Sequence, residues 1–169
     1  SYGGINLIKC FKNYNFSVKK LSLNRKNINF LENSLVLVFS DIKRYSSKII
    51  KSQKHDKANH YKIVKKEVNK IIEVIKCNSK KELGKIFNDH WYRKMKLSNE
   101  MTNTKINNVY NKIMNNKNFY GGKLIGAGGG GFFLFVVKNK EKANKYLKKN
   151  NLDYRHIKID NNGSKTIIF

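Results

Sequence analysis

Apolar residues along this chain follow several spacings, and each spacing predicts a different kind of element. Residues 35–39 and 132–137 are unbroken apolar runs of leucine, valine and phenylalanine, which predicts two buried strands. Residues 3–11 and 15–23 alternate only in part and are separated by the turn-prone sequence Asn13-Tyr14-Asn15. We expect these two segments to pair as a hairpin.

Other segments carry apolar residues at steps of three and four, which is the spacing of an amphipathic helix. This pattern predicts helices at 46–76, 79–97 and 102–116, and a shorter helix is expected at 140–149. Ser79 and Glu82 have the spacing of a capping box, so they predict where the second helix begins. Lysines occupy the positions opposite the first apolar stripe, and this helix should therefore have one solvated face.

The end of the chain predicts one more pair of strands. Residues 154–159 and 165–169 flank Asn161-Asn162-Gly163, whose Asn-Gly step is typical of a tight hairpin turn. The resulting order of strand, helices, strand, helix, strand and strand predicts an α+β fold, with helices on one face of a mainly antiparallel sheet. No internal repeat or linker is visible.

The net charge of +25 at pH 7 comes from 36 Lys and Arg against 11 Asp and Glu. Such a charge is typical of proteins that bind polyanions. Arginine is rare, however, proline is absent, and the abundant Lys, Asn and Ile have codons rich in A and T, so nucleotide bias explains the composition economically. The lysines are also dispersed over helix faces. We therefore expect no nucleic-acid partner, although a basic nucleic-acid-binding domain stays open as an alternative.

The cysteines, the histidines and the hydrophobic pattern narrow the range of possible sites and partners further. The two cysteines lack metal-ligand spacing and are too few for a disulfide framework, which fits a reducing cytoplasm. The four histidines show no HxxxH or HExxH arrangement, so no metal site is expected. The run at 132–137 is too short to span a bilayer, and no membrane partner is expected.

A glycine-rich stretch at 121–131 precedes the second apolar run. Consecutive glycines lose much backbone entropy on folding, so they indicate a place where bare backbone is needed, such as a loop whose amides face a phosphate. Gly126, Gly128 and Gly131 have GxGxxG spacing, but a strand follows instead of a helix. Leu124 stands where the Walker pattern needs Ser or Thr. A flexible linker or a turn between two strands is the alternative interpretation.

The string KLIGAGGGGFFLF at 123–135 resembles the third, C-terminal glycine motif of the GHMP kinases. A wider set of residues is similar in order and spacing to the D-glycero-D-manno-heptose 7-phosphate kinases of that family. These are Tyr2-Gly3-Gly4-Ile5-Asn6, then Trp91, Lys94, Leu97 and Ser98, then the glycine motif, then Gly163-Ser164-Lys165. The resemblance covers nearly the whole chain.

The resemblance implies a ferredoxin-like GHMP C-terminal domain at 34–169, with 1–33 as a hairpin remnant of the N-terminal domain. It also implies that the catalytic Asp and the main ATP loop lie upstream of Ser1, so no catalytic residue is expected in this chain and the fragment alone should be inactive. The implied reaction is transfer of a phosphoryl group from ATP, with Mg²⁺, to the anomeric hydroxyl of heptose 7-phosphate. A non-catalytic module that binds a nucleotide or sugar phosphate is the third possibility.

The resemblance also assigns site residues. The loop is expected to bind the cofactor through Gly126, Ala127, Gly128, Gly129, Gly130 and Gly131. The candidate substrate contacts are Arg44, Lys94 and Lys123. Arg44 ends a segment that is similar to a family element carrying Thr-Gly before the Arg, and Asp41 departs from that pattern. We expect Trp91 to pack in the core.

Overall fold

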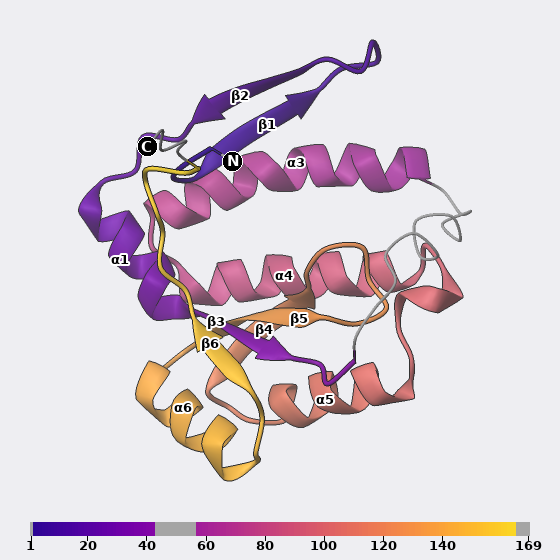
Figure 1. Ribbon diagram of the computed structural model, residues 1–169, viewed down its shortest axis with the longest axis vertical. Coiled ribbons are helices and arrows are strands. Elements are labelled where there is room, and N and C mark those ends of the chain that lie inside the picture. The colour runs from indigo at the N-terminus through magenta and orange to yellow at the C-terminus, as the bar shows by residue number, and fades with distance from the viewer. Residues whose placement is uncertain (1, 43–56, 165–169) are drawn as a thin grey trace, which may run out of the picture.

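The computed structural model describes residues 2–42 and 57–164, which form two antiparallel sheets and the helices around them (Figure 1). The smaller sheet pairs β1 (Asn6–Cys10) with β2 (Phe16–Lys20). In its turn, the amide of Phe11 donates to the carbonyl of Asn15 at 2.9 Å. The hairpin predicted near the N-terminus is therefore confirmed.

The larger sheet has four strands in the order β4-β5-β3-β6, and every neighbouring pair is antiparallel. Its members are β3 (Leu35–Phe39), β4 (Phe119–Leu124), β5 (Phe132–Val137) and β6 (Tyr154–His156). β3 and β5 coincide with the two apolar runs. β4 was not predicted, and β6 is shorter than predicted. The strand expected at 165–169 lies outside the described residues.

Five helices are described, and they include the predicted ones. They are α1 (Arg25–Ser34), α3 (Lys57–Lys76), α4 (Lys80–Met95), α5 (Thr104–Met114) and α6 (Lys140–Lys149). Ser79 accepts a hydrogen bond from the amide of Glu82 at 3.4 Å, which confirms the predicted cap of α4. The predicted first helix began at 46, and residues 43–56 lie outside the described part. α1 was not predicted.

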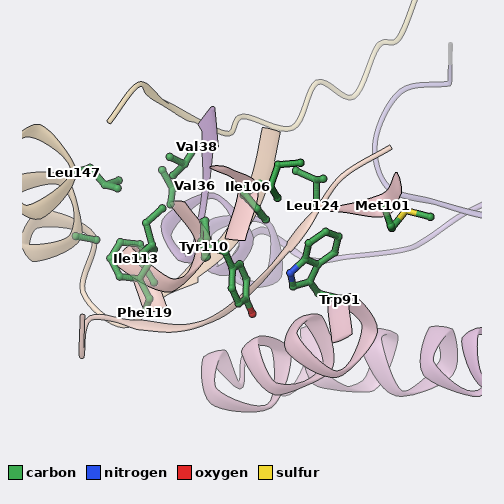
Figure 2. Close-up of a cluster of buried hydrophobic side chains, with 14 of the residues drawn as sticks. Val36, Val38, Trp91, Met101, Ile106, Tyr110, Ile113, Phe119, Leu124 and Leu147 are labelled. Atoms are coloured by element: carbon green, nitrogen blue, oxygen red, sulfur yellow. The ribbon is translucent and has the colours of Figure 1, made fainter. Parts of the chain in front are cut away.

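The apolar core is divided into two clusters by the alternation of side chains along β5. Phe133, Phe135 and Val137 join a cluster with α5 and α6, part of which is drawn in Figure 2. Val136 belongs to the other cluster, with residues of α1, α3 and α4. The α+β class, the antiparallel sheet and its ferredoxin-like strand order are confirmed. Helices are packed on both faces of the sheet, which is more than the one covered face expected from the sequence.

α4 runs along the edge strand β4 and contributes to both clusters. Its Asn88 side-chain oxygen accepts the amide of Gly122 at 2.9 Å and the hydroxyl of Tyr110 at 2.6 Å. Trp91 is fully buried in the core, as expected, with its ring perpendicular to Phe133 at 5.8 Å. These contacts fix the helix against β4, so its last turn stands beside the loop that follows this strand.

Candidate functional site

The loop between β4 and β5 has a backbone that suits glycine. Gly126, Gly128, Gly129, Gly130 and Gly131 all have positive φ, at 74°, 108°, 69°, 141° and 92°. Side-chain-bearing residues rarely adopt these angles, because the Cβ atom collides with the backbone. From the sequence, glycine was expected here because it leaves the backbone bare. The positive φ angles of the turn also require glycine at these positions.

Two neighbouring segments hold this loop from opposite sides. The amide of Gly129 donates to the carbonyl of Met101, in the 3₁₀ helix Asn99–Met101, at 2.9 Å. The amide of Gly131 donates to the carbonyl of Ile42 at 2.9 Å, and Gly131 in turn accepts the amide of Ser40 at 2.8 Å. The loop is thus a fixed turn between two strands and not a flexible linker.

Little room is left for side chains at the buried loop positions. A Cβ atom on Gly130 would lie 2.7 Å from the carbonyl oxygen of Ile42. A Cβ atom on Gly128 would overlap the sulfur of Met101, whose side chain is fully buried. Ile42 and Met101 therefore anchor the loop and also exclude side chains from it.

Four backbone amides of the loop have no hydrogen-bond acceptor among residues 2–42 and 57–164. They belong to Gly126, Ala127, Gly128 and Gly130. Because buried amides are almost always hydrogen-bonded, and both Gly128 and Gly130 are buried, these donors are suited to an acceptor supplied from outside the chain. A run of such amides with positive φ is the kind of concave backbone that binds an anion.

Lys94 and Lys123, two of the candidate substrate contacts, both lie close to this loop. Lys94, in the last turn of α4, donates from its Nζ to the carbonyl of Gly126. Lys123 lies near the end of β4, and its Nζ is 5.2 Å from the centre of the Phe87 ring. Burial lowers the pKa of Lys123. The structure therefore brings both lysines to the same end of the sheet as the loop.

Arg44 lies outside the described residues. The described segment before it ends at Ile42, and the preceding residue, Asp41, has φ 58°. This is the position where the family pattern has glycine. A left-handed backbone explains the family's glycine, and Asp is among the few other residues that adopt it readily.

A cluster of charged residues beside Lys94 was missed by the sequence analysis. Glu67 of α3 forms an ion pair with Arg93 of α4 and lies 3.4 Å from Nδ1 of His90. Burial lowers the pKa of His90, and together with the positive charges of Lys123 and Lys94 it brings that pKa to about 4. Because Glu67 lies on α3 and the other two members lie on α4, no spacing along the sequence indicates the cluster.

Other kinds of site find little support in the described part of the chain. No group of three or more His, Cys, Asp or Glu is placed to hold a metal ion within residues 2–42 and 57–164. No described helix is both long and apolar enough to cross a membrane. A surface hollow of about 380 Å³ beside residues 20–23 is lined by Ile28 and Asn161, and the loop takes no part in it.

Comparison with known proteins assigns the fold and the loop to a family. The family model described as GHMP kinases C terminal matches residues 47–156, which is more than half of the chain. The chain belongs to the GHMP kinases. The resemblance carried by the glycine motif is thereby confirmed, and the relatives of this family are phosphotransferases.

One curated relative is the D-glycero-α-D-manno-heptose 7-phosphate kinase of Campylobacter jejuni. It is 28% identical over 150 residues, which cover 85% of this chain and 44% of the relative. Hence the chain spans less than half the length of the curated protein it matches.

Solved structures of GHMP kinases share the fold. A mevalonate kinase is 25% identical with a TM-score of 0.70, over 95% of this chain and 48% of that one. The mevalonate kinase of Methanococcus jannaschii is 20% identical with a TM-score of 0.67, over 88% and 45%. A D-glycero-D-manno-heptose 1-phosphate kinase of Bacteroides thetaiotaomicron is 21% identical with a TM-score of 0.59, over 95% and 44%.

Proposed function

We propose that this chain is the C-terminal part of an ATP-dependent sugar-phosphate kinase, and that its glycine loop binds the phosphates of the nucleotide. The observation that carries the proposal is the set of loop amides at Gly126, Ala127, Gly128 and Gly130, which have no acceptor in the part of the chain that the structure describes. Phosphoryl transfer depends on positioned donors and cations around the phosphates more than on covalent chemistry. A fixed loop with free amides supplies such donors without reorganisation.

Magnesium belongs to this proposal as part of the nucleotide complex. Mg²⁺ in kinases is held largely by substrate phosphates and water, and it neutralises the charge that develops on the transferred group. The residues of this chain that hold the complex are those of the loop, through the backbone. Gly129 and Gly131 keep the loop in place by donating to Met101 and Ile42.

The acceptor in this proposal is D-glycero-D-manno-heptose 7-phosphate, phosphorylated at its anomeric hydroxyl. Support comes from the names of two similar proteins, both heptose phosphate kinases. Arg44, Lys94 and Lys123 are the proposed contacts of this substrate, and such a reaction belongs to carbohydrate metabolism in the cytoplasm. The catalytic Asp and the main ATP loop are proposed to come from a preceding N-terminal half.

Residues 1–33 are proposed to be the margin of that N-terminal half. The hairpin of β1 and β2 exposes large apolar side chains: Ile8 is 55% exposed, Phe16 59% and Tyr14 97%. Phe11 is also exposed, and such a concentration of apolar surface is typical of a surface that another element covers. A preceding half that packs on this hairpin would place its catalytic residues next to the domain that carries the glycine loop.

Calorimetric titration with magnesium pyrophosphate and with Mg·ATP tests the proposal. Ala127→Pro removes one of the free amides, whereas Ala127→Gly keeps every amide at the same position and serves as the matched control. We expect both ligands to bind, and Ala127→Pro to weaken binding about tenfold, since a well-aimed donor contributes on the order of 1–3 kcal/mol. If neither ligand binds the unaltered chain, or if the two variants bind equally well, the loop is not a phosphate site.

A further inference from the structure

The turn at residues 160–163 packs against the first residues of the chain, beside the N-terminus in Figure 1. The amide of Gly4 donates to the carbonyl of Asp160 at 2.7 Å. A Cβ atom on Gly3 would lie 2.2 Å from the carbonyl oxygen of Asn161, so the two backbones touch with no side chain between them. This turn therefore joins the start of the described chain to its end.

Asn162 and Gly163 form the single Asn-Gly step of the sequence, and both have unused polar groups. Asn162 is exposed, and its side-chain carboxamide has no hydrogen-bond partner within residues 2–42 and 57–164. The amide of Gly163 has no acceptor in that part of the chain either. Gly163 has φ 71° and carries no Cβ atom, so no side chain of its own shields its backbone nitrogen. A nucleophile and a carbonyl carbon are thus neighbours, and neither is held elsewhere.

Two other asparagines show what the free groups of Asn162 change. Asn161 is followed by the amide of Asn162, which already donates to Oδ1 of Asp160 at 2.9 Å. Asn78 is followed by the amide of Ser79, which donates to a carbonyl of α3 at 3.2 Å. At both positions the backbone nitrogen that follows the asparagine would have to give up a hydrogen bond before it could react.

We infer that Asn162 is a site of spontaneous deamidation, and that the isoaspartate formed there loosens the contact of the turn with Gly3 and Gly4. Asparagine is among the chemically labile residues of proteins. The nitrogen of Gly163, once hydroxide has taken its proton, attacks the side-chain carbonyl carbon of Asn162. A C–N bond closes a cyclic succinimide, and the side-chain nitrogen leaves as ammonia. Water then opens the ring at one of its two carbonyl groups, which gives aspartate or isoaspartate.

The two products differ in what they do to the turn. Both add a carboxylate, and Lys20 lies close by, since its Nζ donates to the carbonyl of Asn161 at 3.3 Å. A new negative charge beside this cation is not disruptive by itself. Isoaspartate also lengthens the main chain by a methylene group, and at Gly3 the turn leaves no space even for a Cβ atom. The lengthened turn must therefore shift, and the hydrogen bond from Gly4 to Asp160 is the contact that it should break.

Peptide mass spectrometry of the folded chain tests the modification. The chain is incubated at neutral and at mildly alkaline pH and then digested with trypsin, whose peptide 159–165 contains Asn161 and Asn162, and a sample digested without incubation gives the background. We expect Asn162 to react about tenfold or more faster than Asn161, because its attacking nitrogen gives up no hydrogen bond, and faster at the higher pH. Asn162→Gln should abolish the reaction, whereas Asn161→Gln should leave its rate unchanged. An unreactive Asn162, or equal rates at the two asparagines, would overturn the assignment.

Hydrogen exchange at the Gly4 amide tests the loosening of the turn. NMR compares the unaltered chain, the deamidated chain separated from it by ion exchange, and freshly purified Asn162→Asp, which has the new charge without the added methylene group. We expect the Gly4 amide to exchange about tenfold faster in the deamidated chain, since its hydrogen bond to Asp160 is lost, and at an unchanged rate in Asn162→Asp. Equal exchange in all three chains would overturn the loosening, and so would equal acceleration in the two charged ones. Neither result bears on the proposed phosphate site.

Discussion

Gly121 of β4 and Gly84 of α4 lie against each other with no space for a side chain between strand and helix. A Cβ atom on Gly121 would be 2.6 Å from the carbonyl carbon of Gly84. The close approach allows Asn88, one turn further along α4, to reach the backbone of β4. The position of α4 therefore depends on the absence of a side chain at Gly84 and Gly121. The position of Lys94 beside the loop depends on it as well.

Gly121→Ala should consequently destabilise the fold. The new methyl group would force the α4 backbone away from β4, with a cost of about 3 kcal/mol in the free energy of unfolding. Urea unfolding followed by the fluorescence of Trp91 measures this cost. Lys85→Ala on the exposed face of α4 is the matched control, with an expected change within about 0.5 kcal/mol. Equal stability of the two variants would show that helix and strand are not held this closely.

Gly130→Ala should be more damaging than Gly128→Ala. At Gly130 the added methyl group meets the backbone carbonyl of Ile42, whereas at Gly128 it meets the end of the Met101 side chain, which can move. Both positions also have positive φ, and that strain alone costs about 1–3 kcal/mol in an alanine variant. Thermal unfolding of both variants and of the double variant Gly128→Ala/Met101→Ala checks the order. Met101→Ala should restore little of the stability that Gly128→Ala loses, since it opens a cavity in the core.

Asn88 should contribute more to stability than Tyr110's hydroxyl group. Asn88→Ala leaves the Gly122 amide without its acceptor and leaves the Tyr110 hydroxyl with its longer bond to the carbonyl of Gly122 at 3.4 Å, so we expect a loss of about 2–4 kcal/mol. Tyr110→Phe removes the hydroxyl group alone and should cost about 1 kcal/mol. A double-mutant cycle from urea unfolding measures the coupling between them. Additive losses would mean that the hydrogen bond between the two side chains contributes nothing of its own.

The stability of the fold should fall between pH 6.5 and pH 4 because of His90. Its pKa is about 4 when folded and 6.5 ordinarily, so the unfolded chain takes up a proton first as the pH decreases. The contribution of neutral His90 to the free energy of unfolding is fully present above pH 6.5. Its loss on acidification amounts to on the order of 2–3 kcal/mol. His90→Gln should flatten the pH dependence relative to the unaltered chain, and His156→Gln, at an exposed histidine, should change it little. Parallel curves for the unaltered chain and His90→Gln would contradict this account.

Asp41→Gly should be neutral or slightly stabilising, although it removes a charge. Asp41 has φ 58°, which glycine adopts without a steric penalty, and its side chain is exposed. Asp41→Ala should instead lose about 1 kcal/mol, because alanine lacks a polar group that favours this conformation. Unfolding midpoints of the two variants give the comparison. A larger loss for glycine than for alanine would mean that the carboxylate itself is needed.

Sequence patterns predicted those elements whose local signal agreed with their tertiary packing. β5 is an unbroken apolar run because both of its faces are buried, and α4 has its cap at Ser79. β4 was missed because Gly121 and Gly122 have little strand propensity, and only their packing against α4 and β5 makes glycine necessary there. α1 was missed because its buried face includes the polar residue Asn27, whose amide donates to carbonyls at the end of α3.

The candidate site was predictable only where its residues are contiguous. The glycine motif indicated the loop, but the sequence could not tell that Gly129 and Gly131 use their amides to hold it while their neighbours do not. The charged groups around His90 were not predictable, since Glu67 and Arg93 meet only through the packing of α3 on α4. Arg44 stays a prediction.

Binding of a phosphate group by the free amides of the loop can be measured residue by residue. ¹⁵N-labelled chain is titrated with magnesium pyrophosphate, and each loop amide is followed by NMR. We expect large shifts for Gly126, Ala127, Gly128 and Gly130, and smaller shifts for Gly129 and Gly131, whose amides are already bonded to Met101 and Ile42. Unshifted loop amides at saturation, or shifts confined to Gly129 and Gly131, would show that the free amides bind no phosphate.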